Sequence, residues 1–296
     1  MGLAVGDAVG TTLEFKRPGT FEPITDMIGG GPFELEVGKW TDDTSMALCL
    51  AQSLIDQKRC DPYDQMIKYL NWFRDGYMSS EDECVDIGNT TYDAIVNFEN
   101  SGEAISGNTD RMSAGNGSIM RLAPIPMMYR KDLDLAIEKA RISAKTTHGA
   151  PQSVDTAGFF SYLIVKALNQ ATKSELMNNH SLELEGLDHE LVPILEGSYL
   201  YKNPPQIVGS GYVIKSIEAA LWAFENSTSF KEGCLKAANL GNDADTTAAV
   251  YGQIAGAHYG LSGIPQEWID KLYMKDEIEQ MAEKIFALTN EIEELN

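Results

Sequence analysis

The segment LGNDADTTAAVYGQIAGAHYG, residues 240–260, joins an acidic signature to a run of small residues. Glycines recur every four residues in this run and again at the start of the chain, as Gly252, Gly256 and Gly260 and as Gly2, Gly6 and Gly10. Residues four apart lie on one face of a helix, where glycines let two backbones approach closely, although each interior glycine costs about 1 kcal/mol relative to alanine. The sequence therefore predicts two central helices packed against each other.

Most of the remaining chain is also predicted to be helical. Apolar residues recur at helical spacing in residues 44–57, 151–168, 214–225 and 276–294. No stretch alternates polar and apolar residues between turns as a strand would. We therefore expect an all-α protein.

The domain organisation is predicted to be simple. A chain of 296 residues that is 43% hydrophobic and has no linker or low-complexity tract is expected to form a single domain over residues 1–296. The polar, acidic segment 170–210 is expected to be a surface excursion of that domain, with His180 and His189 in solvent.

Composition argues against several classes of partner. The net charge of −21 disfavours a nucleic-acid footprint or binding to an anionic membrane surface. No apolar run is long enough to predict a membrane span or a signal peptide. The four cysteines are scattered without a C-x-x-C pair, which fits reduced thiols and a cytoplasmic location.

Two acidic signatures, residues 40–44 (WTDDT) and 242–247 (NDADTT), are predicted to form the halves of one metal site. Clustered carboxylates repel one another and need cations when they are buried together. No His or Cys pattern accompanies them, and oxygen-only coordination favours Mg²⁺ or Mn²⁺, with enough carboxylates for two ions. The candidate ligands are Thr41, Asp42, Asp43, Asp243, Asp245 and Thr246. The plain alternative is that Thr41 and Asp243 only cap helices.

The segment AGNGSIMR, residues 114–121, is predicted to be a glycine-rich loop that opens into a helix. Free backbone amides at a helix start can hold an anion. An ordinary loop with a helix cap is an equal alternative on pattern alone. Arg121 is expected to pair with a local acid.

Isolated acids and one histidine give weaker signals. Asp7 and Glu14 are seven residues apart, about two helical turns, so one helix would place them on the same face. His148 has no partners at the spacing of a catalytic triad. Asp86 and Tyr212 lie in loop-like stretches, where an acid beside a tyrosine could hold a guanidinium, but spacing alone indicates no more than a turn.

Five motifs in order resemble the ADP-ribosylglycohydrolase family. They are GDAVGTTLEF (6–15), WTDDTSMA (40–47), GNGSIMRLAP (115–124), TTHGAPQ (146–152) and LGNDADTTAAVYGQIAGAHYG (240–260). The stretches DIGNTT (86–91) and GSGYV (209–213) are most similar to the bacterial branch typified by dinitrogenase-reductase-activating glycohydrolase.

The resemblance implies an all-α fold with a dinuclear Mg²⁺ or Mn²⁺ centre, held by the ligands given above with Glu14 at or beside the metals. It further implies that Gly115, Asn116, Gly117 and Ser118 hold a diphosphate, with His148 near the phosphates or ribose, and that Asp86 and Tyr212 face an arginine. The activity implied is hydrolysis of the C1″ N-glycosidic bond that joins ADP-ribose to arginine of a modified protein, releasing ADP-ribose. The acid–base work would fall to Asp43, Glu14 or Asp86.

Three other functions stay open at this point. The substrate linkage could be to serine or a small molecule, the chain could bind ADP-ribose without turnover, or it could be a metal-dependent phosphoesterase. One position departs from the family pattern: Ala114 stands where some relatives have an aromatic residue that stacks on adenine.

Overall fold

The computed structural model describes residues 1–178 and 186–293. These residues form α-helices joined by short 3₁₀ turns and loops, with isolated β-bridges and no β-strand among them. The α-helices are α1 (Gly2–Gly10), α2 (Asp42–Gln57), α3 (Pro62–Asp75), α4 (Asn89–Ser101), α5 (Gly117–Met120), α6 (Pro124–Met128), α7 (Leu133–Ala144), α8 (Pro151–Leu168), α9 (Lys173–Met177), α10 (Val192–Leu195), α11 (Val213–Glu225), α12 (Phe230–Ala238), α13 (Ala244–Tyr259), α14 (Gln266–Lys271) and α15 (Lys275–Glu293). The all-α prediction is confirmed, and the four predicted amphipathic segments correspond to α2, α8, α11 and α15.

The glycine rows of α1 and α13 lie in direct backbone contact, as predicted. A Cβ on Gly6 would stand 2.1 Å from the carbonyl oxygen of Ala248, and one on Gly252 would stand 2.1 Å from that of Gly2. Gly260 differs from the prediction, because α13 ends at Tyr259 and Gly260 follows it with φ +70. Glycine readily adopts this left-handed backbone, so Gly260 ends the helix instead of packing on α1.

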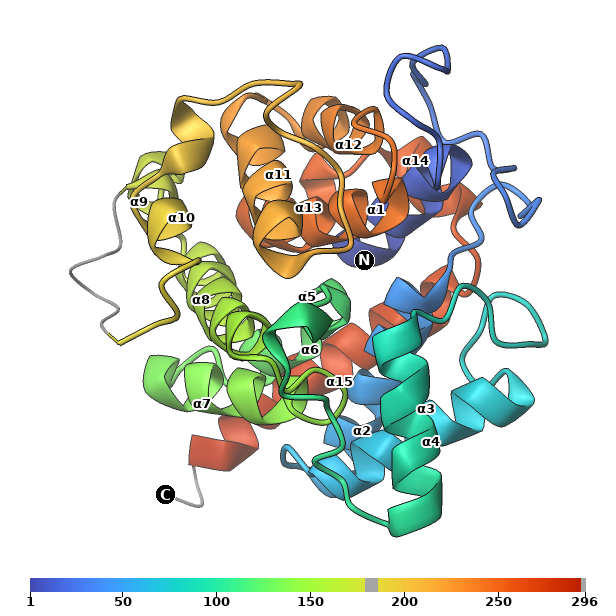
Figure 1. The fold of residues 1–296 in the computed structure, drawn as a ribbon, viewed down its shortest axis with the longest axis vertical. Helices are drawn as coiled ribbons and strands as arrows, with labels where there is room; N and C mark the ends of the chain where they lie inside the picture. The colour runs from blue at the N-terminus through green and yellow to red at the C-terminus, as the bar shows by residue number, and fades with distance from the viewer. Residues whose placement is uncertain (179–185, 294–296) are drawn as a thin grey trace.

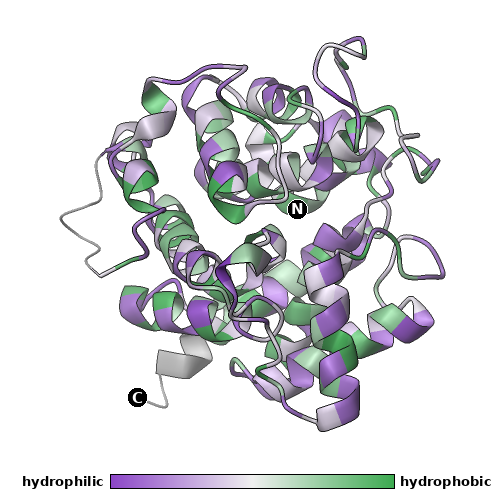
Figure 2. Ribbon diagram, viewed as in Figure 1, coloured by the Kyte–Doolittle hydropathy of each residue, from purple (hydrophilic) through white to green (hydrophobic). Residues whose placement is uncertain are grey.

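The helices share one main core. In Figure 1, α1 and α13 lie together with α11 and α12, while α2, α3 and α4 form a second group with α15 running behind. The buried apolar side chains form one large cluster that reaches across both groups. Figure 2 shows hydrophobic residues along α8, which is buried over most of its length. No helix in the described part of the chain has both the length and the apolar character that crossing a membrane requires.

The described residues of the segment predicted as a surface excursion, 170–178 and 186–210, include buried side chains. Leu191, just before α10, and Tyr199, in a 3₁₀ turn, are fully buried and pack into the core. The apolar residues are few and spread among acids, so the sequence shows little of this packing. His189 is exposed, as expected, and His180 lies outside the described residues.

We expect Gly6→Ala to destabilise the protein by about 1–3 kcal/mol, the usual cost of overpacking, since the new Cβ would overlap the Ala248 carbonyl oxygen. Gly256→Ala is the matched control on the same interface, because its nearest neighbour would be the Gly2 Cα at 3.3 Å. Urea unfolding of both variants measures the difference. Equal unfolding midpoints for the two variants would contradict close contact between α1 and α13.

Candidate metal centre and substrate cleft

Asp7 of α1 caps the N-terminus of α2. Its carboxylate accepts hydrogen bonds from the backbone amides of Thr41 at 3.1 Å and Thr44 at 3.0 Å, and from the Thr44 hydroxyl at 2.7 Å. Thr41 occupies the N-cap position, but its side chain makes no capping bond. The alternative that Thr41 itself caps the helix is therefore wrong, and the Thr41 hydroxyl is left to face other carboxylates.

Glu14 caps α13 in the same way. Its Oε2 accepts hydrogen bonds from the backbone amides of Ala244 at 2.7 Å and Asp245 at 3.3 Å, while the side chain of the N-cap residue Asp243 makes no capping bond. Asp7 and Glu14 do not share a helix face, because α1 ends at Gly10 and a 3₁₀ turn (Thr11–Leu13) intervenes. The two acids of the first motif instead reach two different helices, each of which begins with an acidic signature.

The carboxylates of the two signatures converge on one hydroxyl. The Thr41 Oγ1 lies 2.9 Å from Asp7 Oδ1, 3.1 Å from Asp245 Oδ2 and 3.4 Å from Asp43 Oδ2. A hydroxyl has one proton to donate, so it can satisfy only one of these three oxygens. The Thr246 hydroxyl approaches Asp43 Oδ2 at 3.3 Å from the other side. The cluster is thus short of positive charge.

Burial and mutual repulsion raise the pKa values of these acids. Burial, followed by repulsion from neighbouring carboxylates, holds the pKa values of Asp42 and Asp43 well above their usual range. Burial and then Asp245 raise the pKa values of Asp7 and Asp243 to about 7, and that of Glu14 to about 12. Each of these carboxylates would be stabilised by a bound cation.

The donor set fits divalent cations that prefer oxygen. Two groups of three carboxylates could each hold an ion, and they share Asp245: one is Asp7, Asp43 and Asp245, and the other is Glu14, Asp243 and Asp245. Asp43 Oδ1 is buried and has no hydrogen-bond partner among the described residues. Of the other predicted ligands, Asp42 and Thr246 line the adjoining cleft, and the Thr41 hydroxyl contacts Asp245 of the second signature. Asp7 was missed as a site residue, because the sequence shows only one acid in a row of small residues.

A cleft of about 420 Å³ opens beside the acidic cluster. This is the size of a small-molecule site. Its walls come from Glu14 and the signatures, from the start of α4 and from the glycine-rich loop with His148. Phe15, which is 63% exposed, stands at its edge.

The start of α4 is a second candidate anion site that spacing did not reveal. Gly88 occupies its N-cap position and so provides no capping side chain, and Asn89, Thr90 and Thr91 of the first turn line the cleft. Uncapped amides at a helix N-terminus attract anions. The Gly-Asn-Thr-Thr pattern after Asp86 was the available signal.

The glycine-rich loop packs against His148. A Cβ on Gly115 or Gly117 would lie within 3.0 Å of the imidazole Nε2, so the ring requires glycine at both positions. The side-chain nitrogen of Asn116 is already engaged, because it donates to Asp243 Oδ2 at 2.7 Å. The Ser118 hydroxyl is buried and donates to the carbonyl oxygen of Ser153. The backbone amides of Gly115 and Asn116 donate to the carbonyl oxygens of Ser113 and Gly211, so the amides of Gly117 and Ser118 are the loop donors left for an anion.

Arg121 pairs with no acid among the described residues, contrary to expectation. Its guanidinium donates to the carbonyl oxygen of Gly117 and to the hydroxyls of Thr146 and Thr147, and it lies over the ring of Tyr69. Neutral acceptors and an aromatic face surround this buried charge, while its Nε has no hydrogen-bond partner among the described residues.

Asp86 and Tyr212 are placed differently from each other. Asp86 lines the cleft, has a left-handed backbone (φ +60), and has its pKa raised to about 9 by burial and by Asp245. Tyr212 bridges to Gly115, but its hydroxyl donates to Glu190 Oε1 at 3.0 Å. The structure therefore brings Asp86 to the acidic cluster, whereas the Tyr212 hydroxyl points to the neighbouring segment.

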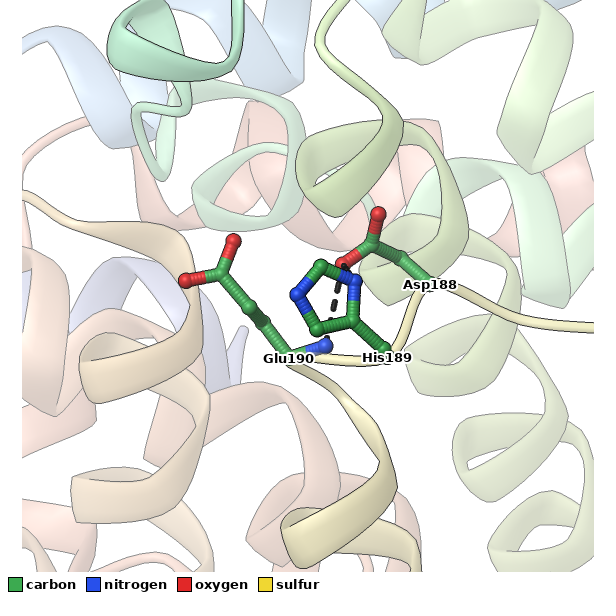
Figure 3. A group of neighbouring side chains, drawn as sticks. All are labelled: Asp188, His189 and Glu190. Atoms are coloured by element: carbon green, nitrogen blue, oxygen red, sulfur yellow. Dashed lines mark hydrogen bonds and ion pairs between the residues drawn. The ribbon is translucent and has the colours of Figure 1, made fainter.

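A third acidic group, shown in Figure 3, is Asp188, His189 and Glu190. Arg111 pairs with both acids, and its hydrogen bond holds the pKa of Asp188 below the usual range. Since Arg111 already pairs with both carboxylates, this group needs a cation less than the buried acids of the cleft do.

The all-helical fold and the buried oxygen-rich cluster define a candidate metal-dependent protein, and the comparisons identify its family. The chain belongs to the ADP-ribosylglycohydrolase family, whose model matches residues 1–294. This confirms the resemblance drawn from the motifs.

Named relatives and a solved structure agree with this assignment. The chain is 42% identical to ADP-ribosylarginine hydrolase Tri1 of Serratia proteamaculans over 98% of this chain and 78% of that protein. It is 31% identical to ADP-ribosyl-[dinitrogen reductase] glycohydrolase of Rhodospirillum rubrum over 97% of this chain and 94% of that protein. A solved ADP-ribosylglycohydrolase-related protein complex matches with a TM-score of 0.87 and 41% identity, covering 97% of this chain and 95% of that one.

We expect Mn²⁺ to raise the Tm of the wild-type protein and to leave that of Asp245→Asn nearly unchanged, because Asp245 belongs to both groups of carboxylates. A hundredfold excess over Kd would stabilise the wild type by about 2.7 kcal/mol. Glu190→Gln is the control, since Glu190 belongs to the third acidic group and to neither of the two groups that contain Asp245. An equal response of Asp245→Asn and the wild type would contradict the site.

The stability of the metal-free protein should fall as the pH rises. The raised pKa values of Asp7 and Asp243 mean that these acids stabilise the folded state while protonated, and that this stability is lost between about pH 4 and about pH 7. Mn²⁺ should restore it at the upper end of this range, because cations replace the protons. Thermal denaturation at several pH values with and without Mn²⁺ measures both effects.

Proposed function

We propose that this protein is a metal-dependent hydrolase that removes ADP-ribose from arginine side chains of modified proteins. The observation that supports it best is the cleft itself, in which buried carboxylates from two distant signatures meet uncapped amides and a histidine. The names of the relatives from Serratia proteamaculans and Rhodospirillum rubrum support the choice of ADP-ribose, and the former supports the arginine linkage.

Two Mg²⁺ or Mn²⁺ ions are proposed as cofactors, held by Thr41, Asp42, Asp43, Asp243, Asp245 and Thr246 with Glu14 beside them. When bound, such ions would neutralise the carboxylates, orient sugar hydroxyls and lower the pKa of water. Asp7, absent from the predicted set, is added as a residue that fixes Thr41 and Thr44 and belongs to one of the two groups of carboxylates that could hold an ion.

The diphosphate is proposed to lie between the glycine-rich loop and the start of α4. Amides on both sides would donate to its oxygens, and both segments line the same cleft. His148 lies against the loop and adds one more donor. In this proposed arrangement the distal ribose would lie toward the acidic cluster.

Hydrolysis requires a proton for the leaving guanidine. Water attacks C1″, the C1″–N bond electrons move to the guanidino nitrogen, and that nitrogen takes up a proton as ADP-ribose and arginine separate. Asp86 is the proposed residue that holds the guanidinium or moves this proton, because it lines the cleft beside Asp245. Asp43 and Glu14 remain the other candidates for guiding the water.

The setting of the reaction is proposed as cytoplasmic, with an ADP-ribosylated protein as the partner. All four cysteines are free, which fits a reducing compartment.

The full chain with Mg²⁺ or Mn²⁺ should release ADP-ribose from an arginine-linked peptide faster than from a serine-linked peptide of the same sequence. Quantifying free ADP-ribose by chromatography measures both rates. Faster cleavage of the serine linkage would overturn the arginine assignment. Release of phosphate from nucleotides without release of ADP-ribose would point to a phosphoesterase.

Asp86→Asn serves as the variant for this assay. Loss of a proton donor or acceptor should lower kcat on the arginine linkage by about 10²–10⁴-fold, while ADP-ribose binding persists because the loop and α4 amides are unchanged. Asp82→Asn, four residues earlier and outside the cleft lining, is the control and should retain wild-type turnover.

A further inference from the structure

A chain of hydrogen bonds leads from a buried cation to the imidazole in the cleft. Arg121 is 1% exposed, and its Nη2 donates to Thr147 Oγ1 at 2.7 Å. Thr147 Oγ1 in turn lies 2.9 Å from His148 Nδ1. Arginine stays protonated in proteins and can only donate, so the first bond of the chain has a fixed direction.

The direction of the second bond follows from counting protons. Thr147 is fully buried, and Arg121 and His148 are the partners found for its hydroxyl oxygen in the described residues. If Nδ1 were protonated, both neighbours would donate to Thr147 and its own proton would have no acceptor. A buried donor left without a partner costs about 1–3 kcal/mol. The Thr147 hydroxyl therefore donates to Nδ1, and Nδ1 is the acceptor.

The opposite edge of the ring faces the substrate cleft. His148 lines the cleft, and its Nε2 and Cε1 lie against Gly115 and Gly117, where added Cβ atoms would stand 2.5–3.0 Å away. Burial and the nearby Arg121 lower the pKa of His148 to about 3, so the ring has one proton at neutral pH. With Nδ1 accepting, that proton is on Nε2.

We propose that Arg121 and Thr147 are positioning residues that hold a neutral His148 in the Nε2–H tautomer, so that the cleft presents a fixed N–H donor to a diphosphate oxygen. The identity of the anion rests on the proposed function, whereas the tautomer does not. His148 then acts as a neutral hydrogen-bond donor, neither a general base nor a cation. Gly115 and Gly117 contribute as well, because their lack of side chains leaves room for the Nε2 edge of the His148 ring.

The tautomer can be observed directly by NMR of the full chain labelled with ¹⁵N-histidine. The chain has four histidines, and the spectrum of His148→Asn assigns the signals of His148. We expect an unprotonated Nδ1 and a protonated Nε2 at neutral pH, without substrate or turnover. A protonated Nδ1 in the wild type would overturn the proposal even if no variant folded.

Thr147→Ser and Thr147→Val form a matched pair, because the first keeps the hydroxyl and the second replaces it with a methyl group. Thr147→Ser should keep the wild-type tautomer and ADP-ribose affinity. Thr147→Val should show a mixture of tautomers and an ADP-ribose Kd raised about tenfold, as expected for a weakened hydrogen bond to a charged group.

Three outcomes separate the parts of this inference. Identical tautomer and Kd in both variants would contradict the positioning role. A changed tautomer with unchanged Kd would contradict donation to the diphosphate. A wild-type protein with the expected tautomer that neither binds nor releases ADP-ribose would refute the proposed function and the identity of the anion, while the role of Arg121 and Thr147 in fixing the tautomer would stand.

Discussion

Direct backbone contact between α1 and α13 sets the position of the carboxylates in the cleft. Because glycines allow the two helices to touch, α1 runs beside α13, which begins at the second acidic signature. The chain then continues from the end of α1 through a loop to α2, which begins at the first signature. Asp7 then reaches the N-terminus of α2, and Glu14 reaches that of α13. Each signature helix is thus capped by an acid from the first motif, and its own acids and hydroxyls remain free to face the cleft.

The same arrangement concentrates charge that proteins normally avoid burying. Helix N-termini favour nearby carboxylates by about 0.3–1 kcal/mol each, which is small against the burial and repulsion that raise the pKa values of Asp43 and Glu14. Divalent cations would remove this deficit, so the energetics of the fold and the chemistry of the site are linked. The other side of the cleft, formed by the glycine-rich loop, the start of α4 and His148, has no excess of negative charge. Its amides and its neutral histidine are hydrogen-bond donors suited to an anion. An ADP-ribosyl group matches both sides, because its ribose hydroxyls suit the acidic side and its phosphates suit the side with amides and histidine.

Much of the fold could be predicted from the sequence, because α2, α8, α11, α15 and the two glycine rows have strong helical spacing. That the two acidic signatures come together could also be predicted, since two groups of clustered carboxylates need cations when they are buried together. Long-range capping was not predictable. Asp7 accepts a hydrogen bond from a helix N-terminus 37 residues away, and Glu14 accepts one from a helix N-terminus 230 residues away. No local sequence pattern indicates such pairs. The partners of Arg121 were predicted wrongly, because hydroxyls, a carbonyl and an aromatic ring replaced the expected acid. The candidate site roles themselves stay predictions.

Anomalous scattering from crystals grown with Mn²⁺ would test the central claim most directly, namely that the two acidic signatures form one divalent-cation site. The account predicts anomalous peaks within coordination distance of carboxylates from both signatures, with Asp245 beside each ion. No peak in the cleft, or Mn²⁺ bound only at Asp188 and Glu190, would contradict it.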